Sequence, residues 1–239
     1  MLQNKVRAAV ATSVVLLGAF AFRANRAASA KEVADTTSKI LAATATATPS
    51  VMAVTDNAAT ESVVFAGGCF WGVQAVFQHT KGVISARSGY SGGQKTTATY
   101  EAVSTGATGH AEAVKVIFDP GKVSYQQLLT IFFSVVHDPT ELNFQGPDHG
   151  TQYRSEVFTN SAEQKKATED FIAQLAAKKV YNKPIVTVVA PLSGFFEAEA
   201  YHQDYATIHP NDMYIAINDA PKVENLKKQF PTVYRAEIK

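Results

Sequence analysis

The sequence predicts an α+β fold, a two-layer α/β sandwich in which helices pack on a mixed, largely antiparallel sheet. From residue 61 onward, short runs rich in Val, Ile and Phe alternate with segments whose apolar residues recur at helical spacing. Gly, Pro, Asp and Asn separate these segments, and the chain shows neither an internal repeat nor a heptad pattern. Alternating strand and helix signals of this kind indicate helices that cover a sheet.

The first half of this region predicts three strands and one helix. Residues 62–66 form a nearly continuous apolar run that ends at two glycines, and a helix begins at or near Cys69. Residues 82–90 alternate like a strand. Residues 112–118 predict another strand with alternate apolar side chains on one face, and an Asp-Pro-Gly turn stops it.

The middle of the chain predicts a helix, a loop and a strand. Ser124 is a suitable N-cap for an amphipathic helix that extends to about residue 136. Residues 137–152 are rich in Gly, Pro, Asp and Asn, and we expect an ordered loop, which at this length is often functional. Residues 154–158 predict a further strand.

The last third carries weaker signals. A helix begins at Asn160 or Ser161 and extends to about residue 179, with Gln164 placed as in a capping box. Residues 185–189 predict a strand. Beyond residue 191 we expect mostly irregular structure, with a short helix at about 198–205.

Composition excludes two classes of function. The 239 residues carry 22 basic and 21 acidic side chains, a net charge of +1, so the chain offers no field that would attract nucleic acid. The six histidines do not group with cysteine in zinc-site spacing. We therefore expect no metal and no organic cofactor.

Residues 1–30 have the pattern of a targeting leader. Lys5 and Arg7 precede an apolar run at 8–22 that is short for a membrane span, and Ala28-Ser29-Ala30 resembles a cleavage site. We expect export, for example to a periplasm, or import into a plastid or another organelle; an uncleaved membrane anchor is the alternative. Residues 31–60 are Ala/Thr-rich and predict a disordered linker. The catalytic domain is then residues 61–239, with an irregular C-terminal tail.

Cys69 is the only cysteine of the chain, and it lies within the run Gly-Gly-Cys-Phe-Trp-Gly at residues 67–72. A lone cysteine is more commonly a buried structural residue. Here it follows a strand and a Gly-Gly turn and stands at a helix start. Unpaired N–H groups and the helix dipole favour a thiolate at that position, and the thiolate is the nucleophilic form. The context therefore predicts a reactive, ionised sulfur.

Several further segments carry groups that handle protons or hydrogen bonds. They include Thr-Tyr-Glu at 99–101, Thr-Gly-His-Ala-Glu at 108–112 and Asp-His-Gly-Thr-Gln-Tyr at 148–153. Together with the segment around Cys69, the Gly-Tyr-Ser-Gly-Gly run at 89–93, His-Asp-Pro-Thr at 137–140 and Ala-Tyr-His-Gln at 200–203, they resemble the A-type peptide methionine sulfoxide reductases. The likeness spans roughly residues 63–205. It implies reduction of methionine S-sulfoxide, free or in proteins, as repair of oxidative damage.

The resemblance also implies a role for each site residue. The nucleophile is Cys69 and the proton donor to the sulfoxide oxygen is Glu112, whose pKa burial must raise. The remaining members bind substrate: Phe70 and Trp71 line a methyl pocket, Tyr100 and Tyr153 hydrogen-bond the oxygen, and Asp148 binds substrate or water. Without the resemblance, the aromatic residues would be core or surface residues, and the glutamate would face solvent. His110 and His149 are interpreted as structural hydrogen-bonding residues, and Tyr90 as support for its loop.

The sequence departs from the family pattern in two ways. Many relatives carry recycling cysteines, whereas these 239 residues contain none besides Cys69. An external thiol must then reduce the Cys69 sulfenic acid: thioredoxin, or glutaredoxin with glutathione. Phe144 stands where relatives often have a basic residue, which puts a charged substrate contact there in doubt. We expect a monomer.

Two rival functions remain open at this point. Cys69 with His110 or His149 would form an acyl-transfer pair, which requires a histidine nitrogen within hydrogen-bonding distance of the sulfur. Alternatively, the apolar pocket binds thioethers or oxidised methionine without turnover.

Overall fold

The computed structural model describes residues 35–36, 38–40 and 60–238. The leader predicted at residues 1–30 lies outside the described residues, as does most of the predicted linker. Residues 35–36 and 38–40 are helical, and Ile40 is fully buried in the main hydrophobic core. The prediction of a disordered linker is therefore wrong for these residues, because an apolar side chain that packs into the core fixes them. No helix in the described part of the chain has the length and hydropathy of a membrane span.

Six strands of the described region form one sheet in the order β7-β6-β1-β3-β2-β8. They are β1 (Glu61–Gly67), β2 (Val83–Ser91), β3 (Ala111–Phe118), β6 (Ser155–Thr159), β7 (Val188–Pro191) and β8 (Phe195–Glu197). All neighbouring pairs are antiparallel except β6 and β7, which are parallel. The predicted mixed, largely antiparallel sheet is thus confirmed. The loop that follows α4 contains a separate two-stranded hairpin, β4 (Phe144–Gln145) and β5 (Asp148–His149).

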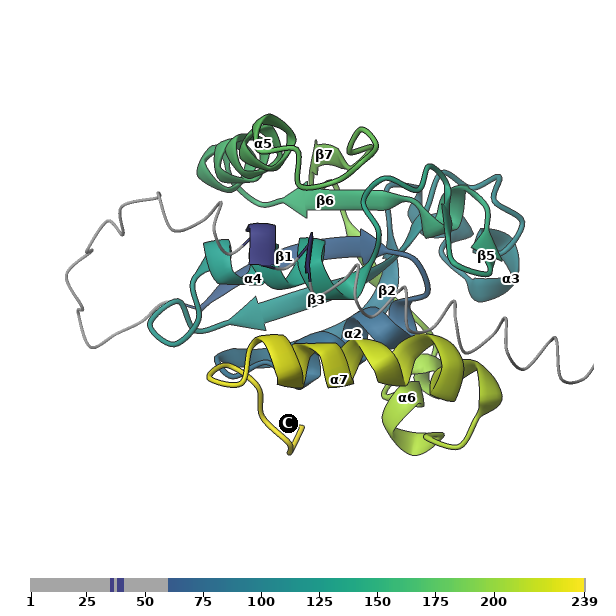
Figure 1. Ribbon diagram of the computed structural model, residues 1–239. Coiled ribbons are helices and arrows are strands. Elements are labelled where there is room, and N and C mark those ends of the chain that lie inside the picture. The colour runs from purple at the N-terminus through teal and green to yellow at the C-terminus, as the bar shows by residue number, and fades with distance from the viewer. Residues whose placement is uncertain (1–34, 37, 41–59, 239) are drawn as a thin grey trace, which may run out of the picture.

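Helices and helical turns connect the strands. The α-helices are α2 (Phe70–Gln78), α3 (Tyr100–Val103), α4 (Tyr125–Ile131), α5 (Ala162–Ala177), α6 (Tyr205–Ile208) and α7 (Ala220–Gln229). The shorter turns are η1 (Lys95–Thr97), η2 (Phe132–Val136), η3 (Thr151–Tyr153), η4 (Ala200–His202) and η5 (Ile215–Asp219); η2 and η5 are π-helical and the others are 3₁₀. Figure 1 shows α7 alongside α2, with α5 next to β6 and β7.

The sheet separates a large core from a small one. Along the central strand β1, Val63 and Phe65 belong to the main cluster with residues of the helices, whereas Val64 and Ala66 pack in a smaller cluster. Because successive side chains of a strand point to opposite faces, both faces of β1 are buried. This explains why its sequence is a continuous apolar run.

The predicted helix caps are present. The Ser124 hydroxyl accepts a hydrogen bond from the Gln127 N–H at 3.1 Å, and the Gln127 side chain accepts one from the Ser124 N–H at 2.9 Å, a complete capping box. Ser161 caps α5 by accepting from the Gln164 N–H at 3.1 Å. The Gln164 side chain accepts instead from the Asn160 N–H, one residue before the N-cap.

The last third of the chain differs from the predictions. The strand expected at 185–189 begins later, at Val188, because the Val186 N–H bonds the Pro139 carbonyl at 2.8 Å instead of entering the sheet. The short helix expected at 198–205 is two turns, η4 and α6, separated at Asp204, whose φ of 59° is left-handed. The prediction of an irregular C-terminal tail is also wrong, because β8, η5 and α7 lie beyond residue 191.

Candidate active site

Cys69 lies at the junction between β1 and α2. Gly68 has a φ of +86°, and a Cβ on it would lie 2.7 Å from the Cβ of Gln145, so both the turn and the neighbouring loop require glycine there. Cys69 is the N-cap residue of α2, and its side chain makes no capping hydrogen bond. Its exposed fraction is 8%, and it forms part of the wall of a cavity.

The predicted ionised state of Cys69 is wrong for the resting protein. Burial raises the pKa of the Cys69 thiol well above its ordinary value, and the charges of Glu112 and Asp219 raise it further. The Trp71 backbone N–H and the Lys222 ammonium lower it, but by less. The N–H groups of the helix start thus act as predicted, but desolvation outweighs them. The resting site therefore holds a thiol.

Glu112 is buried on β3 with 4% of its surface exposed. Its Oε2 accepts a hydrogen bond from the Phe70 backbone N–H at 3.1 Å, which joins it to the first turn of α2. Burial raises the pKa of Glu112 to about 8, although the Phe70 N–H partly opposes this shift. The carboxyl group is therefore mostly protonated at neutral pH and can donate a proton, as the sequence-based assignment requires.

Tyr100 and Tyr153 come from separate segments, at the start of α3 and the end of η3. Burial raises the pKa of both phenols, and the charge of Glu112 is the next cause in each case. The charge of Cys69 also raises both values. The two hydroxyl groups thus lie within electrostatic range of the acid and the sulfur, and both remain neutral donors.

Phe70 and Trp71 differ in exposure. Phe70 is 1% exposed and belongs to the main core, so it supports the site by packing in the core. Trp71 is partly buried; it stacks on Tyr205 with ring centroids 3.9 Å apart, and its Nε1–H donates to His202 Nδ1 at 3.2 Å. Tyr214 meets the same indole edge-on at 5.9 Å. Trp71 is therefore the member of the predicted pair that can form an apolar wall.

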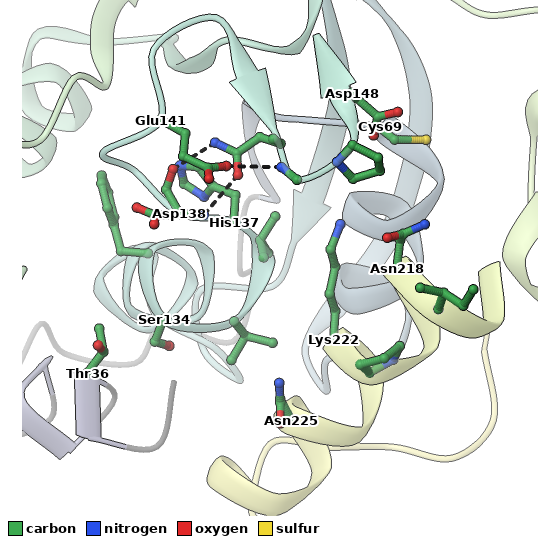
Figure 2. Close-up of a pocket in the computed structure, with 18 of the residues that line it drawn as sticks. Thr36, Cys69, Ser134, His137, Asp138, Glu141, Asp148, Asn218, Lys222 and Asn225 are labelled. Carbon is green, nitrogen blue, oxygen red and sulfur yellow. Dashed lines mark hydrogen bonds between the residues drawn. The ribbon is translucent and has the colours of Figure 1, made fainter. Parts of the chain in front are cut away.

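A cavity of about 410 Å³ reaches Cys69 between the loop at 137–148 and the elements η5 and α7. Figure 2 shows Cys69 and Asp148 at one end, with Asn218 and Lys222 next along the wall. Asp148 accepts a hydrogen bond from the Tyr214 hydroxyl. Of the predicted site residues, only Cys69 and Asp148 line this cavity. The other predicted residues lie outside the lining of this cavity.

Of the two histidines near the site, His110 has the structural hydrogen bonds expected of it, whereas the His149 side chain makes no hydrogen bond within the described residues. His110 accepts from the Gly93 N–H at 3.2 Å through Nδ1, and its Nε2 bonds the Gln94 carbonyl at 3.0 Å. His149 is exposed and stacks on Phe144 with centroids 5.3 Å apart. Neither histidine has a ring nitrogen hydrogen-bonded to the Cys69 sulfur. This contradicts the acyl-transfer hypothesis, which requires such a bond.

Sequence reasoning missed a group of supporting residues beyond residue 191. Glu199 accepts from the Tyr90 hydroxyl at 2.8 Å and from the Tyr100 backbone N–H at 2.9 Å, so it fixes the start of α3. Tyr90 therefore supports this loop, as expected. The His202 ring lies 4.5 Å from the Tyr100 ring. Tyr205, Tyr214, Asp219 and Lys222 complete the group.

The comparison with known proteins decides the family. The family model for peptide methionine sulfoxide reductase matches residues 61–234. The chain belongs to the peptide methionine sulfoxide reductase family. A reductase of this family from Mesorhizobium japonicum is 56% identical over 174 residues, 73% of this chain and 89% of the relative. One from Synechocystis is 44% identical over 178 residues, 74% of this chain and 83% of the relative.

Solved structures agree with this assignment. The structure of Mxr1 from Saccharomyces cerevisiae in reduced form has a TM-score of 0.60 at 32% identity, covering 66% of this chain and 90% of that chain. Methionine sulfoxide reductase A of Corynebacterium diphtheriae has a TM-score of 0.56 at 34% identity, covering 63% and 76%. The solved structures therefore agree with both the α+β fold and the reductase family.

Proposed function

We propose that this protein is a peptide-methionine (S)-S-oxide reductase in which Cys69 attacks the sulfoxide sulfur and Glu112 supplies the proton. One observation carries the proposal: the only cysteine lies beside a buried carboxyl group whose pKa of about 8 keeps it protonated at neutral pH. A sulfoxide oxygen must be protonated as it leaves sulfur, and a neutral carboxylic acid in a dry site is suited to that task.

The reaction is a two-electron exchange between two sulfur atoms. The Cys69 sulfur loses its proton and attacks the sulfoxide sulfur while Glu112 protonates the oxygen. The attack forms a bond between the two sulfur atoms, and the oxygen also takes up the proton lost by Cys69 and leaves as water. A water molecule then attacks the Cys69 sulfur and returns a proton to Glu112, so the bond between the two sulfur atoms breaks, methionine is released and Cys69 is left as a sulfenic acid. The net reaction is sulfoxide plus thiol to thioether plus sulfenic acid.

Neighbouring residues select and stabilise the substrate. The hydroxyl groups of Tyr100 and Tyr153 donate to the sulfoxide oxygen as charge builds on it. The Trp71 indole receives the S-methyl group, and the polar oxygen is excluded from that wall. This orientation favours the S epimer, and Asp148 binds the substrate amide or a water molecule.

Return to the thiol requires an external reductant, because Cys69 is the only cysteine of these 239 residues. A first thiol attacks the sulfenic acid and releases water, which leaves a mixed disulfide; a second thiol releases Cys69 and an external disulfide. Thioredoxin, or glutaredoxin with glutathione, supplies these thiols, and the protein acts as a monomer. Residues 1–30 direct it to a periplasm, plastid or other organelle, which a fluorescent fusion of residues 1–60 would locate.

The test is a single turnover without reductant. Purified protein is incubated with excess methionine S-sulfoxide, and we expect one methionine per chain and one extra oxygen on the Cys69 peptide by mass spectrometry. Cys69→Ser is the matched control and should form no methionine. A second methionine per chain without added thiol would contradict the single-cysteine mechanism. Retention of all activity by Cys69→Ser would contradict the nucleophile itself and favour a binding protein.

A further inference from the structure

An ion pair with a buried carboxylate lies next to Cys69 on the C-terminal side of the molecule. Asp219, at the end of η5, is fully buried, and its Oδ1 lies 3.1 Å from Nζ of Lys222 on α7, whose side chain is 21% exposed. The second oxygen of Asp219, Oδ2, is buried without a hydrogen-bond partner. Burying a carboxylate costs free energy that a single ion pair often fails to offset, so this pair has to be explained by something other than stability.

The pair packs directly on the first turn of α2. A Cβ placed on Gly72 would lie 2.1 Å from Asp219 Oδ1 and 2.8 Å from Lys222 Nζ. Only glycine lets the pair approach this closely. Since Gly72 is three residues after Cys69, the motif around the cysteine is shaped to receive these two side chains.

The same pair shares a cavity wall with the sulfur. Lys222 and Cys69 both line the 410 Å³ cavity, and Figure 2 shows the Lys222 side chain extending from α7 toward the end where Cys69 lies. Within α2, a negative charge on the Cys69 sulfur is compensated by the Trp71 backbone N–H, which is a dipole and carries no full charge. A nearby ammonium can supply that charge compensation.

Several ionisable groups face Cys69 from the surrounding elements. Glu112 and Asp219 disfavour a negative sulfur, whereas Lys222 favours it. The other ionisable groups around the sulfur are Asp148 on β5, Tyr100 on α3, Tyr153 on η3 and Tyr214 just before η5. Among these groups, Lys222 is the one that carries a positive charge.

We propose that Lys222 is a positioning residue that stabilises the Cys69 thiolate as it forms, with Asp219 holding the ammonium against Gly72. The inference rests on the proposed nucleophilic role of Cys69. It gives the C-terminal segment a function in place of the recycling cysteines that many relatives carry there.

The test measures Cys69 alkylation by iodoacetamide from about pH 6 to about pH 10, without sulfoxide. Lys222→Met should slow alkylation about tenfold across this range, because a smaller fraction of the sulfur is ionised at each pH. Lys222→Arg should recover most of the rate, because it keeps the charge. Lys228→Met, an exposed lysine of the same helix, is the matched control and should leave the curve unchanged. Superimposed curves for Lys222→Met and the unmodified protein would overturn the inference.

Lys222→Met leaves a buried carboxylate without its partner, which can cause misfolding, so a second comparison controls for misfolding. Asp219→Asn removes that carboxylate, and the double variant Asp219→Asn/Lys222→Met should react about tenfold more slowly than Asp219→Asn alone. Equal rates for these two proteins would also overturn the inference. Neither result depends on turnover. Failure of methionine formation would therefore contradict the proposed function without altering the alkylation result.

Discussion

The two sides of Cys69 are built from different chemistry. On one side, which we call the oxygen side, Glu112, Tyr100 and Tyr153 are all neutral donors at pH 7, because burial raises their pKa values. On the other, the C-terminal side, the buried carboxylate of Asp219 forms an ion pair with the partly buried Lys222. Neutral donors suit an oxygen that gains a proton, and a cation suits a sulfur that loses one. The comparison indicates that different residues handle the two proton transfers: the oxygen side gives a proton to the sulfoxide oxygen, and the C-terminal side stabilises the sulfur that loses one.

The largest expected effect is on the oxygen side. Glu112→Gln removes the proton donor, and methionine formation should fall about 10²–10⁴-fold. Above about pH 8, where Glu112 is ionised, the same substitution removes a negative charge that raises the pKa of Cys69, so alkylation of the thiol should become faster there. Steady-state kinetics and iodoacetamide trapping on one preparation measure both. A fall in both rates would indicate a damaged site and contradict the assigned role.

Tyrosines on the two sides offer a smaller, matched comparison. Tyr153→Phe removes a donor to the sulfoxide oxygen and should lower the single-turnover rate about 10²-fold. Tyr214→Phe loses only the hydrogen bond to Asp148 and should change the rate by less than about tenfold. Both variants keep the aromatic ring, so packing is matched. Equal losses would mean that the division between the two sides is wrong.

The oxygen side could be predicted from the sequence, and the C-terminal side could not. Cys69, Glu112 and Tyr153 lie in short runs that identify the family and follow clear strand or loop signals. By contrast, α7 fully buries only Leu226, so it lacks the broad apolar face that marks a helix. Pro221 in its first turn and the two lysines in its last were the available signals.

Protonation was the harder property to predict. The sequence pattern of a helix start correctly predicted a backbone N–H, that of Trp71, near the sulfur. The desolvation of the thiol could not be predicted in the same way, because it depends on packing by segments that are far away in the chain. The core strands and the caps at Ser124 and Ser161 depend on local pattern, and they were predicted well. The break at Asp204 depends on contacts with Gln74 and Gln78, which no local pattern contains.

The pH dependence of a single turnover tests the central claim most directly. Rapid quenching of the unmodified protein with methionine S-sulfoxide, from about pH 6 to about pH 10, follows the two protons together. We expect the rate to rise toward about pH 8, the pKa of Glu112, and then to level off, because the Cys69 thiol keeps its last proton to well above that pH. Glu112→Gln should lose this plateau. A rate for the unmodified protein that climbs steadily to the top of this range would contradict proton donation by Glu112.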